Sequence, residues 1–242
     1  ACTICVAYEG MERFFPKEKI VLTGNPVRQN LLTNSVSREE AVEYFHLDPQ
    51  KKTILVLGGS LGARTINQTL QAAIPIMQEH PEVQWIWQTG KIYIEQVKNA
   101  ISEITGEIVM GTRVGALPNL YVTDFIKDMS KAYAAADLVI SRAGAGSISE
   151  FCLLHKPVIL VPSPNVAEDK KKKNALALVN KEAALYVKDA DAQKELVQTA
   201  LHTVGDEEKL SSLSREIAKL ALPDSANVIA HYVLDLIKKN KQ

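Results

Sequence analysis

Two stretches of small residues follow apolar runs in this sequence, and both could bind phosphate groups. They are LVLGGSLGAR at residues 55–64 and LVISRAGAGSISE at residues 138–150. A backbone without β-carbons can approach a phosphate closely, and the free N–H groups that start a following helix point towards it. Neither stretch matches the G-x-G-x-x-G pattern of nicotinamide cofactors or the lysine-bearing P-loop. A glycine after a strand is often only a tight turn, but two such turns favour a nucleoside diphosphate ligand.

Hydroxyl and charged side chains near these glycines suggest how a nucleotide could be held. Ser60, Ser147 and Ser149 could add hydroxyl donors. Glu150, within the second helix, could accept hydrogen bonds from the two hydroxyls of a ribose. A solvated helix glutamate is an equally good interpretation of Glu150, and spacing alone does not choose between them. The run Lys170–Lys173 is either a solvated surface or a source of one or two positive charges at the phosphate end.

Strand and helix signals alternate along the chain, which predicts an α/β fold with a mostly parallel sheet and helices on both faces. The strands expected from apolar runs cover residues 3–8, 19–23, 53–59, 83–90, 120–125, 137–141, 157–162 and 184–187. The expected helices start after Ser37 and cover 63–78, 92–101, 129–136, 147–154, 174–180 and most of the chain beyond 187, with a break at 222–225. In such a Rossmann-like, doubly wound sheet, ligands bind outside the carboxyl ends of the strands, where both glycine turns fall.

The bulk composition is that of a globular protein. The 242 residues carry 28 basic and 28 acidic side chains, so no basic excess indicates nucleic acid as a partner. Cys2, Cys5 and Cys152 lack metal-site spacing and are expected to be reduced thiols. No apolar run reaches the roughly 18–20 residues of a membrane span. The chain opens almost directly on a strand and lacks an initiator methionine, which suggests a processed or truncated sequence.

Five motifs occur in the order that one glycosyltransferase family shows. They are GNPVR (24–28), GGSLGAR (58–64), FIKDM (125–129), SRAGAGSISE (141–150) and VPSPNVAED…NA (161–175). Over essentially its whole length, the chain resembles the peptidoglycan glycosyltransferases of the MurG type. These enzymes transfer N-acetylglucosamine (GlcNAc) from UDP-GlcNAc to undecaprenyl-pyrophosphoryl-N-acetylmuramoyl-pentapeptide. The resemblance implies a GT-B fold, with two Rossmann-like domains around a cleft, and neither a metal ion nor another cofactor.

The resemblance also divides the chain into two unequal parts. Residues 1–34 match the end of the N-terminal, acceptor-binding domain and the connection between domains. Residues 35–242 match the C-terminal domain that binds the UDP-sugar, with a last helix that could pack back on the N-terminal domain. The implied partners are UDP-GlcNAc and the lipid-linked acceptor, at the cytoplasmic face of the bacterial inner membrane.

The family's opening glycine-rich loop, with the histidine often proposed as base, has no counterpart in this chain. We therefore expect the catalytic base and the membrane contact in the N-terminal domain. This chain alone is expected to be soluble, to bind the UDP-sugar weakly and to turn over nothing.

Matched position by position, the resemblance implies a set of residues that contact the donor. Arg28 and Ser60 match a donor-contacting arginine and serine, and Ile126 matches the residue whose backbone meets the uracil. In the family, one loop and the beginning of the helix after it surround the diphosphate, and the last residue of this run contacts the ribose. The matching residues here are Ala145, Gly146, Ser147, Ile148, Ser149 and Glu150. Asn174 matches an asparagine near the sugar. Lys171 stands where relatives have a glutamine that contacts the GlcNAc hydroxyls; because lysine only donates, either sugar recognition is altered here or the lysine tract is not native.

One hypothesis and two alternatives follow. The hypothesis is an inverting, metal-independent transfer in which backbone N–H groups and a helix dipole stabilise the departing diphosphate. A sugar-nucleotide epimerase of the same fold would need acid and base side chains facing the sugar, and no such arrangement is evident for His46, His80, His155, His202 and His231. A non-catalytic subunit that binds donor and recruits a separate acceptor half is the other alternative. Residues 1–34 argue against it, because they look like the tail of an attached domain.

Overall fold

The centre of the molecule is a sheet with apolar residues on both faces. The computed structural model describes residues 2–7, 9–28, 30–33, 36–59, 61–109, 111–163 and 169–239. The strands of the sheet are β3 (Lys52–Leu57), β4 (Val83–Gln88), β5 (Arg113–Val114), β6 (Leu117–Thr123), β7 (Leu138–Ser141), β8 (Val158–Leu160) and β9 (Leu185–Tyr186). Their order is β5-β6-β4-β3-β7-β8-β9, and all neighbours are parallel except β5 and β6. This confirms the expected, mostly parallel sheet.

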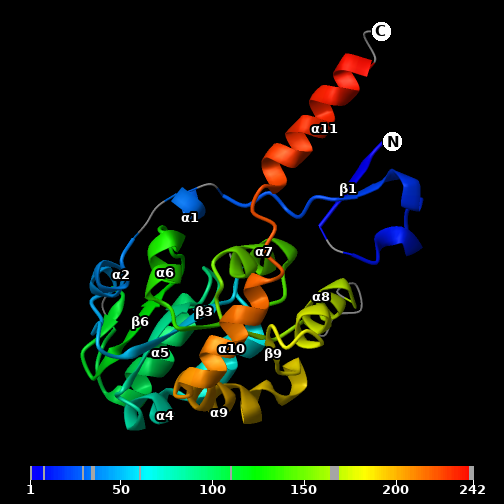
Figure 1. Ribbon diagram of the computed structural model, residues 1–242. Helices are drawn as coiled ribbons and strands as arrows, with labels where there is room; N and C mark the ends of the chain where they lie inside the picture. The colour runs from blue at the N-terminus through cyan, green and yellow to red at the C-terminus, as the bar shows by residue number, and fades with distance from the viewer. Residues whose placement is uncertain are drawn as a thin grey trace.

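Helices cover both faces of this sheet (Figure 1). One face packs against α3 (Arg64–Ala72), α4 (Ile74–Glu79), α5 (Ile94–Thr105) and α9 (Ala192–Val204). The other packs against α2 (Arg38–Tyr44), α6 (Met129–Ala135), α7 (Ala145–Leu153), α8 (Asp169–Val179) and the end of α10 (Glu207–Ala218). Successive side chains of a strand point to opposite faces, so Ile54 and Val56 of β3 join the first cluster while Leu55 and Leu57 join the second.

The chain reverses its direction across the sheet between β3 and β7. From β3 it continues to β4 and then β6 on one side; it then returns to β7, beside β3, and continues to β8 and β9. Such a reversal opens a crevice at the carboxyl ends of the two adjacent strands. One glycine turn follows β3 and the other follows β7, so the doubly wound fold brings the two turns together.

Some boundaries differ from those expected. The helix expected over 63–78 is divided into α3 and α4 at Ala73, because Pro75 cannot donate the backbone hydrogen bond that a continuous helix needs. The strand expected at 120–125 starts at Leu117 and pairs with β5, whose two residues are too few to give a periodic signal. α8 starts five residues before the expected residue 174. The helix after Ser37 starts as expected, with the Ser37 hydroxyl accepting from the Glu40 N–H at 3.1 Å.

The first and last segments of the chain lie together at one end of the α/β body (Figure 1). β1 (Ile4–Val6) and β2 (Ile20–Leu22) form a separate two-stranded parallel sheet, and α1 (Asn30–Thr33) follows on the way to the body. α11 (Ser225–Lys239) projects from the body near this small sheet, after the break expected at 222–225. None of the described helices combines the length and the apolar character that crossing a bilayer requires.

Candidate functional site

A cavity of about 760 Å³ lies where the sheet reverses between β3 and β7. Its wall includes both glycine turns, the loop after β6 and one residue of the N-terminal segment. Small-molecule sites typically have volumes of roughly 300–1,000 Å³. Of the residues predicted from the sequence, Arg28, Ile126, Ser147 and Glu150 belong to this wall. Together with Gly59 and Arg64 of the GGSLGAR motif, they bring residues from four separate motifs to one cavity.

The second glycine turn leaves open space beside a helix start. Gly144 is the N-cap of α7, and no side chain caps this helix. A β-carbon on Gly144 would approach only the Ser147 hydroxyl, at 3.7 Å, and one on Gly146 would meet nothing within 4 Å. Packing of the protein therefore does not require glycine at these two positions. Backbone N–H groups of an uncapped first turn, together with the helix dipole, suit a bound anion.

The first glycine turn is different, because close backbone packing accounts for two of its glycines. Gly62 has a φ of +83°, and a β-carbon there would lie 2.3 Å from the Thr89 carbonyl oxygen. A β-carbon on Gly58 would lie 2.8 Å from the Ala63 nitrogen. Only Gly59, with a φ of +77°, has open space around it. The tight-turn interpretation therefore holds for Gly58 and Gly62, and Gly59 is the member of this turn that can face a ligand.

Glu150 is held in the cavity wall by two side chains. The Tyr133 hydroxyl donates to Glu150 Oε2 at 2.7 Å, and the Arg28 guanidinium donates to Glu150 Oε1 at 3.0 Å. The side chain of Glu150 is 14% exposed while that of Arg28 is 56% exposed. Burial, reinforced by the charge of Glu150, raises the pKa of Tyr133 well above its usual range, so the phenol stays protonated and donates. The carboxylate is thus fixed in orientation and keeps further acceptor positions.

Three arginines, Arg28, Arg64 and Arg142, contribute to the same cavity wall. The Arg142 guanidinium forms an ion pair with Asp189 and donates to the Val161 carbonyl oxygen at 2.9 Å. Asp189 in turn accepts from the Thr65 hydroxyl at 2.8 Å. These three contacts join the segments that follow β3, β7, β8 and β9 into one unit, which we call the Asp189 brace. Arg28 is paired with Glu150 and Arg142 with Asp189, so among the described residues of the wall the excess positive charge comes from Arg64, and it favours an anionic ligand.

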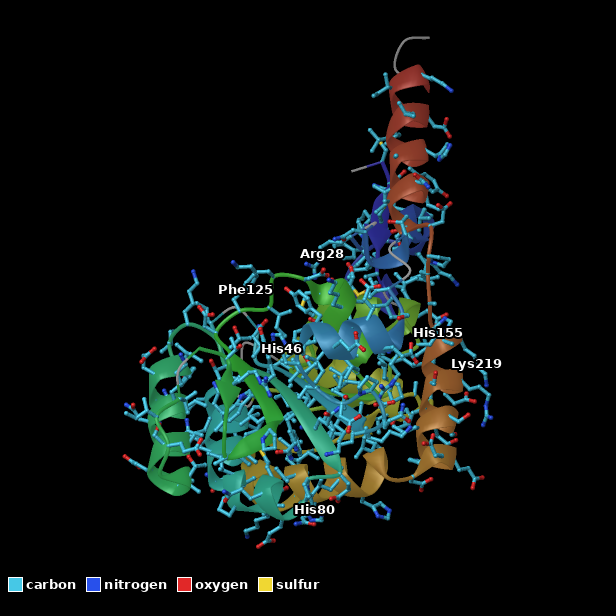
Figure 2. All side chains as sticks on the ribbon, turned by 90° about the vertical axis from the view of Figure 1, so that its left-hand side faces the viewer. Arg28, His46, His80, Phe125, His155 and Lys219 are labelled. Atoms are coloured by element: carbon cyan, nitrogen blue, oxygen red, sulfur yellow. The ribbon has the colours of Figure 1, made fainter. Side chains whose placement is uncertain are left out.

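The loop after β6 forms another part of the wall. Ile126 is buried, and its neighbour Phe125 is 49% exposed. Phe125 and Arg28 lie along the same edge of the body, with His80 at the opposite end (Figure 2). The side-chain amide of Gln88, at the end of β4, accepts from the Ile126 N–H at 3.0 Å and donates to the Gly59 carbonyl oxygen at 3.2 Å. An exposed aromatic side chain beside backbone hydrogen-bonding groups is suited to binding a ligand that has a flat heteroaromatic ring.

Part of the predicted helix start faces away from this cavity. The Ser149 hydroxyl donates to the Ala145 carbonyl oxygen and accepts from the Asn25 amide, both at 3.1 Å. Ile148 and Ser149 line a second cavity of about 440 Å³, between α7 and the N-terminal segment. The structure therefore uses these residues to dock the GNPVR segment on α7.

The residues predicted near the sugar lie outside the cavity or outside the described residues. Asn174 belongs to α8 and is not part of the described wall. Ser60, the loop 164–168 and the side chain of Lys171 lie outside the described residues. The sequence interpretation did not identify Tyr133, Gln88, Arg64, Arg142 or Asp189. Arg64 and Arg142 stand within the GGSLGAR and SRAGAGSISE motifs, which could have drawn attention to them. Tyr133 and Asp189 carry no motif signal, and Gln88 has only its position at the end of a buried strand.

Other kinds of site find little support in the described part of the chain. No group of three or more His, Cys, Asp and Glu residues there could hold a metal ion. Cys2, Cys5 and Cys152 are free thiols. None of the histidines contributes to the described wall of the larger cavity.

Curated relatives and a family model match this chain. The model, described as the glycosyltransferase family 28 C-terminal domain, matches residues 53–229. Two similar relatives are the UDP-N-acetylglucosamine–N-acetylmuramyl-(pentapeptide) pyrophosphoryl-undecaprenol N-acetylglucosamine transferases of Bacteroides fragilis and Bacteroides thetaiotaomicron. They are 64% and 62% identical to this chain over 98% of its length, and the chain spans only 60% and 61% of theirs.

A solved structure, that of Acinetobacter baumannii MurG, has a similar fold. Its TM-score is 0.70 at 28% identity, and the match covers 99% of this chain and 60% of that one. This likeness and the strand order confirm the expected fold, the Rossmann-like C-terminal half of a GT-B glycosyltransferase. Because the family model matches most of its residues, this chain belongs to the family of glycosyltransferase family 28 C-terminal domains.

Proposed function

We propose that this chain is the donor-binding part of an N-acetylglucosaminyltransferase of peptidoglycan synthesis. The whole enzyme transfers GlcNAc from UDP-GlcNAc to undecaprenyl-linked N-acetylmuramoyl-pentapeptide, as the names of its relatives suggest. One observation carries the proposal: an uncapped helix start, several arginines and one fixed carboxylate surround a single cavity at the sheet reversal. This combination suits a diphosphate with a ribose attached.

Each part of the donor has a proposed position. The diphosphate lies at the start of α7, near Gly144 and Ser147, with Arg28 as a positive charge beside it. The ribose hydroxyls donate to Glu150, and the uracil meets the backbone at Ile126. For Ser60, Lys171 and Asn174, the proposal of a role near the donor rests on the resemblance alone.

The proposed transfer inverts the configuration of the sugar. The 4-hydroxyl of the acceptor attacks the anomeric carbon of GlcNAc on the face opposite UDP. The bond from that carbon to the diphosphate oxygen breaks, and the growing negative charge is stabilised by N–H groups and the dipole of α7. A base in the N-terminal domain takes the proton of the hydroxyl. The resemblance implies that this transfer needs no metal ion.

The remaining part of the full-length enzyme has the other proposed roles. We assign residues 1–34 to the end of the N-terminal domain and to the connection, and residues 35–242 to the donor domain. The N-terminal domain binds the lipid-linked acceptor and contacts the cytoplasmic face of the inner membrane. The exposed apolar side chains of α11, including Val233, Leu234 and Ile237, support packing of this helix on that domain.

Titration of the chain with UDP-GlcNAc, UDP-GalNAc and UDP tests the donor assignment. We expect UDP and UDP-GlcNAc to compete for one site. The substitution Glu150→Ala should lower the affinity for each of them by roughly tenfold, because the ribose hydroxyls lose a charged acceptor. Glu103→Ala, at an exposed glutamate of α5, is the control. No binding of any of the three compounds, or equal effects of the two substitutions, would contradict the assignment.

Two further assays separate the proposed role from its alternatives. In a transfer assay with radiolabelled UDP-GlcNAc and lipid-linked acceptor, we expect no product from this chain alone. Product formation would show that the base lies within these 242 residues. Incubation with UDP-GlcNAc followed by analysis of the sugar nucleotide would reveal an epimerase by the appearance of a stereoisomer.

A further inference from the structure

Gln88 occupies a central position at the edge of the sheet that carries the cavity. It is the last residue of β4, which lies between β3 and β6, and it is 5% exposed. Its Oε1 accepts from the Ile126 N–H at 3.0 Å, and its Nε2 donates to the Gly59 carbonyl oxygen at 3.2 Å. The opposite orientation of the amide would set donor against donor and acceptor against acceptor, so these partners fix the orientation. Gln88 thus joins the loops that follow both neighbouring strands.

This contact decides which polar group of Ile126 a ligand can meet. The N–H of Ile126 is already bonded to Gln88, whereas its carbonyl oxygen accepts no hydrogen bond from the described residues. Ile126 and Gln88 both belong to the cavity wall. At this point of the wall, therefore, Ile126 offers its carbonyl oxygen as an acceptor, while its N–H donor is already occupied by Gln88.

An acceptor at this position discriminates between pyrimidine bases. Uracil has a hydrogen on N3 and can donate it to a carbonyl oxygen, whereas N3 of cytosine is itself an acceptor. A buried polar group left without a partner, or facing a like group, lowers the affinity for the wrong ligand. A free N–H of Ile126 would instead suit cytosine N3.

We propose that Gln88 is a positioning residue that makes this site select uracil over cytosine. It does so by occupying the Ile126 N–H and holding the loop after β6 so that the carbonyl oxygen meets the base. This inference rests on the proposed function, since it requires that the cavity binds a nucleoside diphosphate with its base at Ile126.

Equilibrium binding of UDP, CDP and inorganic pyrophosphate to the chain tests this inference. The substitution Gln88→Met removes both hydrogen bonds at nearly constant side-chain volume. We expect the chain to bind UDP at least about tenfold more tightly than CDP, and Gln88→Met to reduce this ratio by about tenfold, because UDP binds more weakly and CDP more tightly. Pyrophosphate affinity should stay within about twofold, since the start of α7 is unchanged.

Gln84→Met is a matched control on the same strand. Gln84 is also buried and also bonds through both ends of its amide, with the backbone N–H and carbonyl oxygen of Asp48 at 2.7 and 2.8 Å, but it lies towards the other end of β4. We expect this substitution to lower stability while leaving the ratio of UDP to CDP affinity unchanged. If Gln88 had a purely structural role, Gln88→Met would lower the affinities for UDP and CDP equally, because part of the protein would be unfolded.

Each outcome bears on one of the two proposals. If the chain binds neither nucleotide, the proposed function fails. If it binds both equally, or if Gln88→Met leaves the ratio unchanged, the role of Gln88 is overturned while nucleotide binding stands. Should Gln88→Met not fold, Gln88→Glu keeps an acceptor for the Ile126 N–H; it should retain the preference for UDP while its charge weakens pyrophosphate binding, and loss of the preference would contradict the inference.

Discussion

Glu150 depends on two side chains that are distant from it in the sequence. Tyr133 is 17 positions away and Arg28 is 122 positions away, yet both donate to its carboxylate. Tyr133 is 2% exposed, and its ring packs edge-on against Phe151 at 6.0 Å between centroids. The phenol is therefore fixed by packing before it donates. It can hold the carboxylate at one angle for the ribose, whereas the exposed Arg28 is free to turn towards a phosphate.

We expect Tyr133→Phe to weaken UDP binding by roughly threefold to tenfold, because Glu150 loses one orienting hydrogen bond. The loss should be smaller for 2′-deoxy-UDP, which offers the carboxylate one hydroxyl fewer, so the ratio of the two affinities should fall. Calorimetric titration with both nucleotides measures this ratio. Tyr232→Phe, at an exposed position of α11, is the control. An unchanged ratio would mean that Tyr133 only supports the packing of α6.

The sequence predicted the residue that carries the charge but not the residues that orient it. Glu150 stands out because it follows two glycines at the start of a helix, and the physical chemistry of that position is local. Tyr133 is an aromatic residue on the apolar face of a helix, and such residues most often belong to the core. Only the packing of α6 against α7 shows that its hydroxyl reaches a carboxylate.

The elements around the cavity are joined by contacts between their ends. The Asp189 brace connects Thr65 at the start of α3, Arg142 after β7 and Val161 after β8. Asp189 itself lies in the 3₁₀ turn after β9. The brace therefore holds the segments behind both glycine turns at a fixed separation, which keeps the start of α7 in place relative to the rest of the cavity wall.

Asp189→Ala leaves the Arg142 guanidinium without its carboxylate and the Thr65 hydroxyl without its acceptor. We expect the free energy of unfolding to fall by roughly 1–3 kcal/mol, since both hydrogen bonds are partly buried. UDP affinity should fall as well, by about threefold to tenfold, as the two turns lose their fixed separation. Urea denaturation and nucleotide titration measure the two effects. Asp191→Ala, in the same 3₁₀ turn, removes an equal charge without breaking the brace and should change neither quantity much.

At the level of elements, apolar runs were sufficient to predict the central parallel strands β3, β4, β7 and β8, because these are buried on both faces. The order of the strands was not predictable from these runs, and the brace depends on that order. Arg142 and Asp189 are 47 positions apart and Thr65 and Asp189 are 124 apart, so no local pattern could connect them. The doubly wound fold narrowed the search to the carboxyl ends of the strands, where all of these residues lie.

In the whole molecule, the segment around Gly24 meets the turn before α11, beside the candidate cavity. Gly24 packs against Leu222 and Ser225 in the turn that leads to α11. Directly after Gly24, the Asn25 amide donates to the Ala145 carbonyl oxygen at 3.3 Å. Arg28 then reaches Glu150. The segment 24–28 therefore contacts both α7, which forms the candidate site, and the start of α11, so a movement of either chain end can reach the cavity wall.

Gly24→Ala tests this connection. Gly24 has a φ of +79°, and a β-carbon there would lie 2.4 Å from the Ser225 hydroxyl oxygen and 2.9 Å from the Leu222 β-carbon, so the turn before α11 must move. Gly10→Ala is a matched control, because Gly10 has a φ of +78° but nothing within 4 Å of its β-carbon position. Both substitutions cost roughly 1–2 kcal/mol of backbone strain, and only Gly24→Ala adds a clash.

We expect hydrogen exchange to report the difference between the two variants. In Gly24→Ala, amides of residues 20–28 and of the first turns of α11 should exchange faster, while those of β3, β4 and β7 should keep their protection. The UDP affinity of Gly24→Ala should also fall, because Asn25 and Arg28 lose their positions on α7. In Gly10→Ala, faster exchange should stay within the segment between β1 and β2. Equal exchange of α11 in the two variants would mean that α11 moves independently of the candidate cavity.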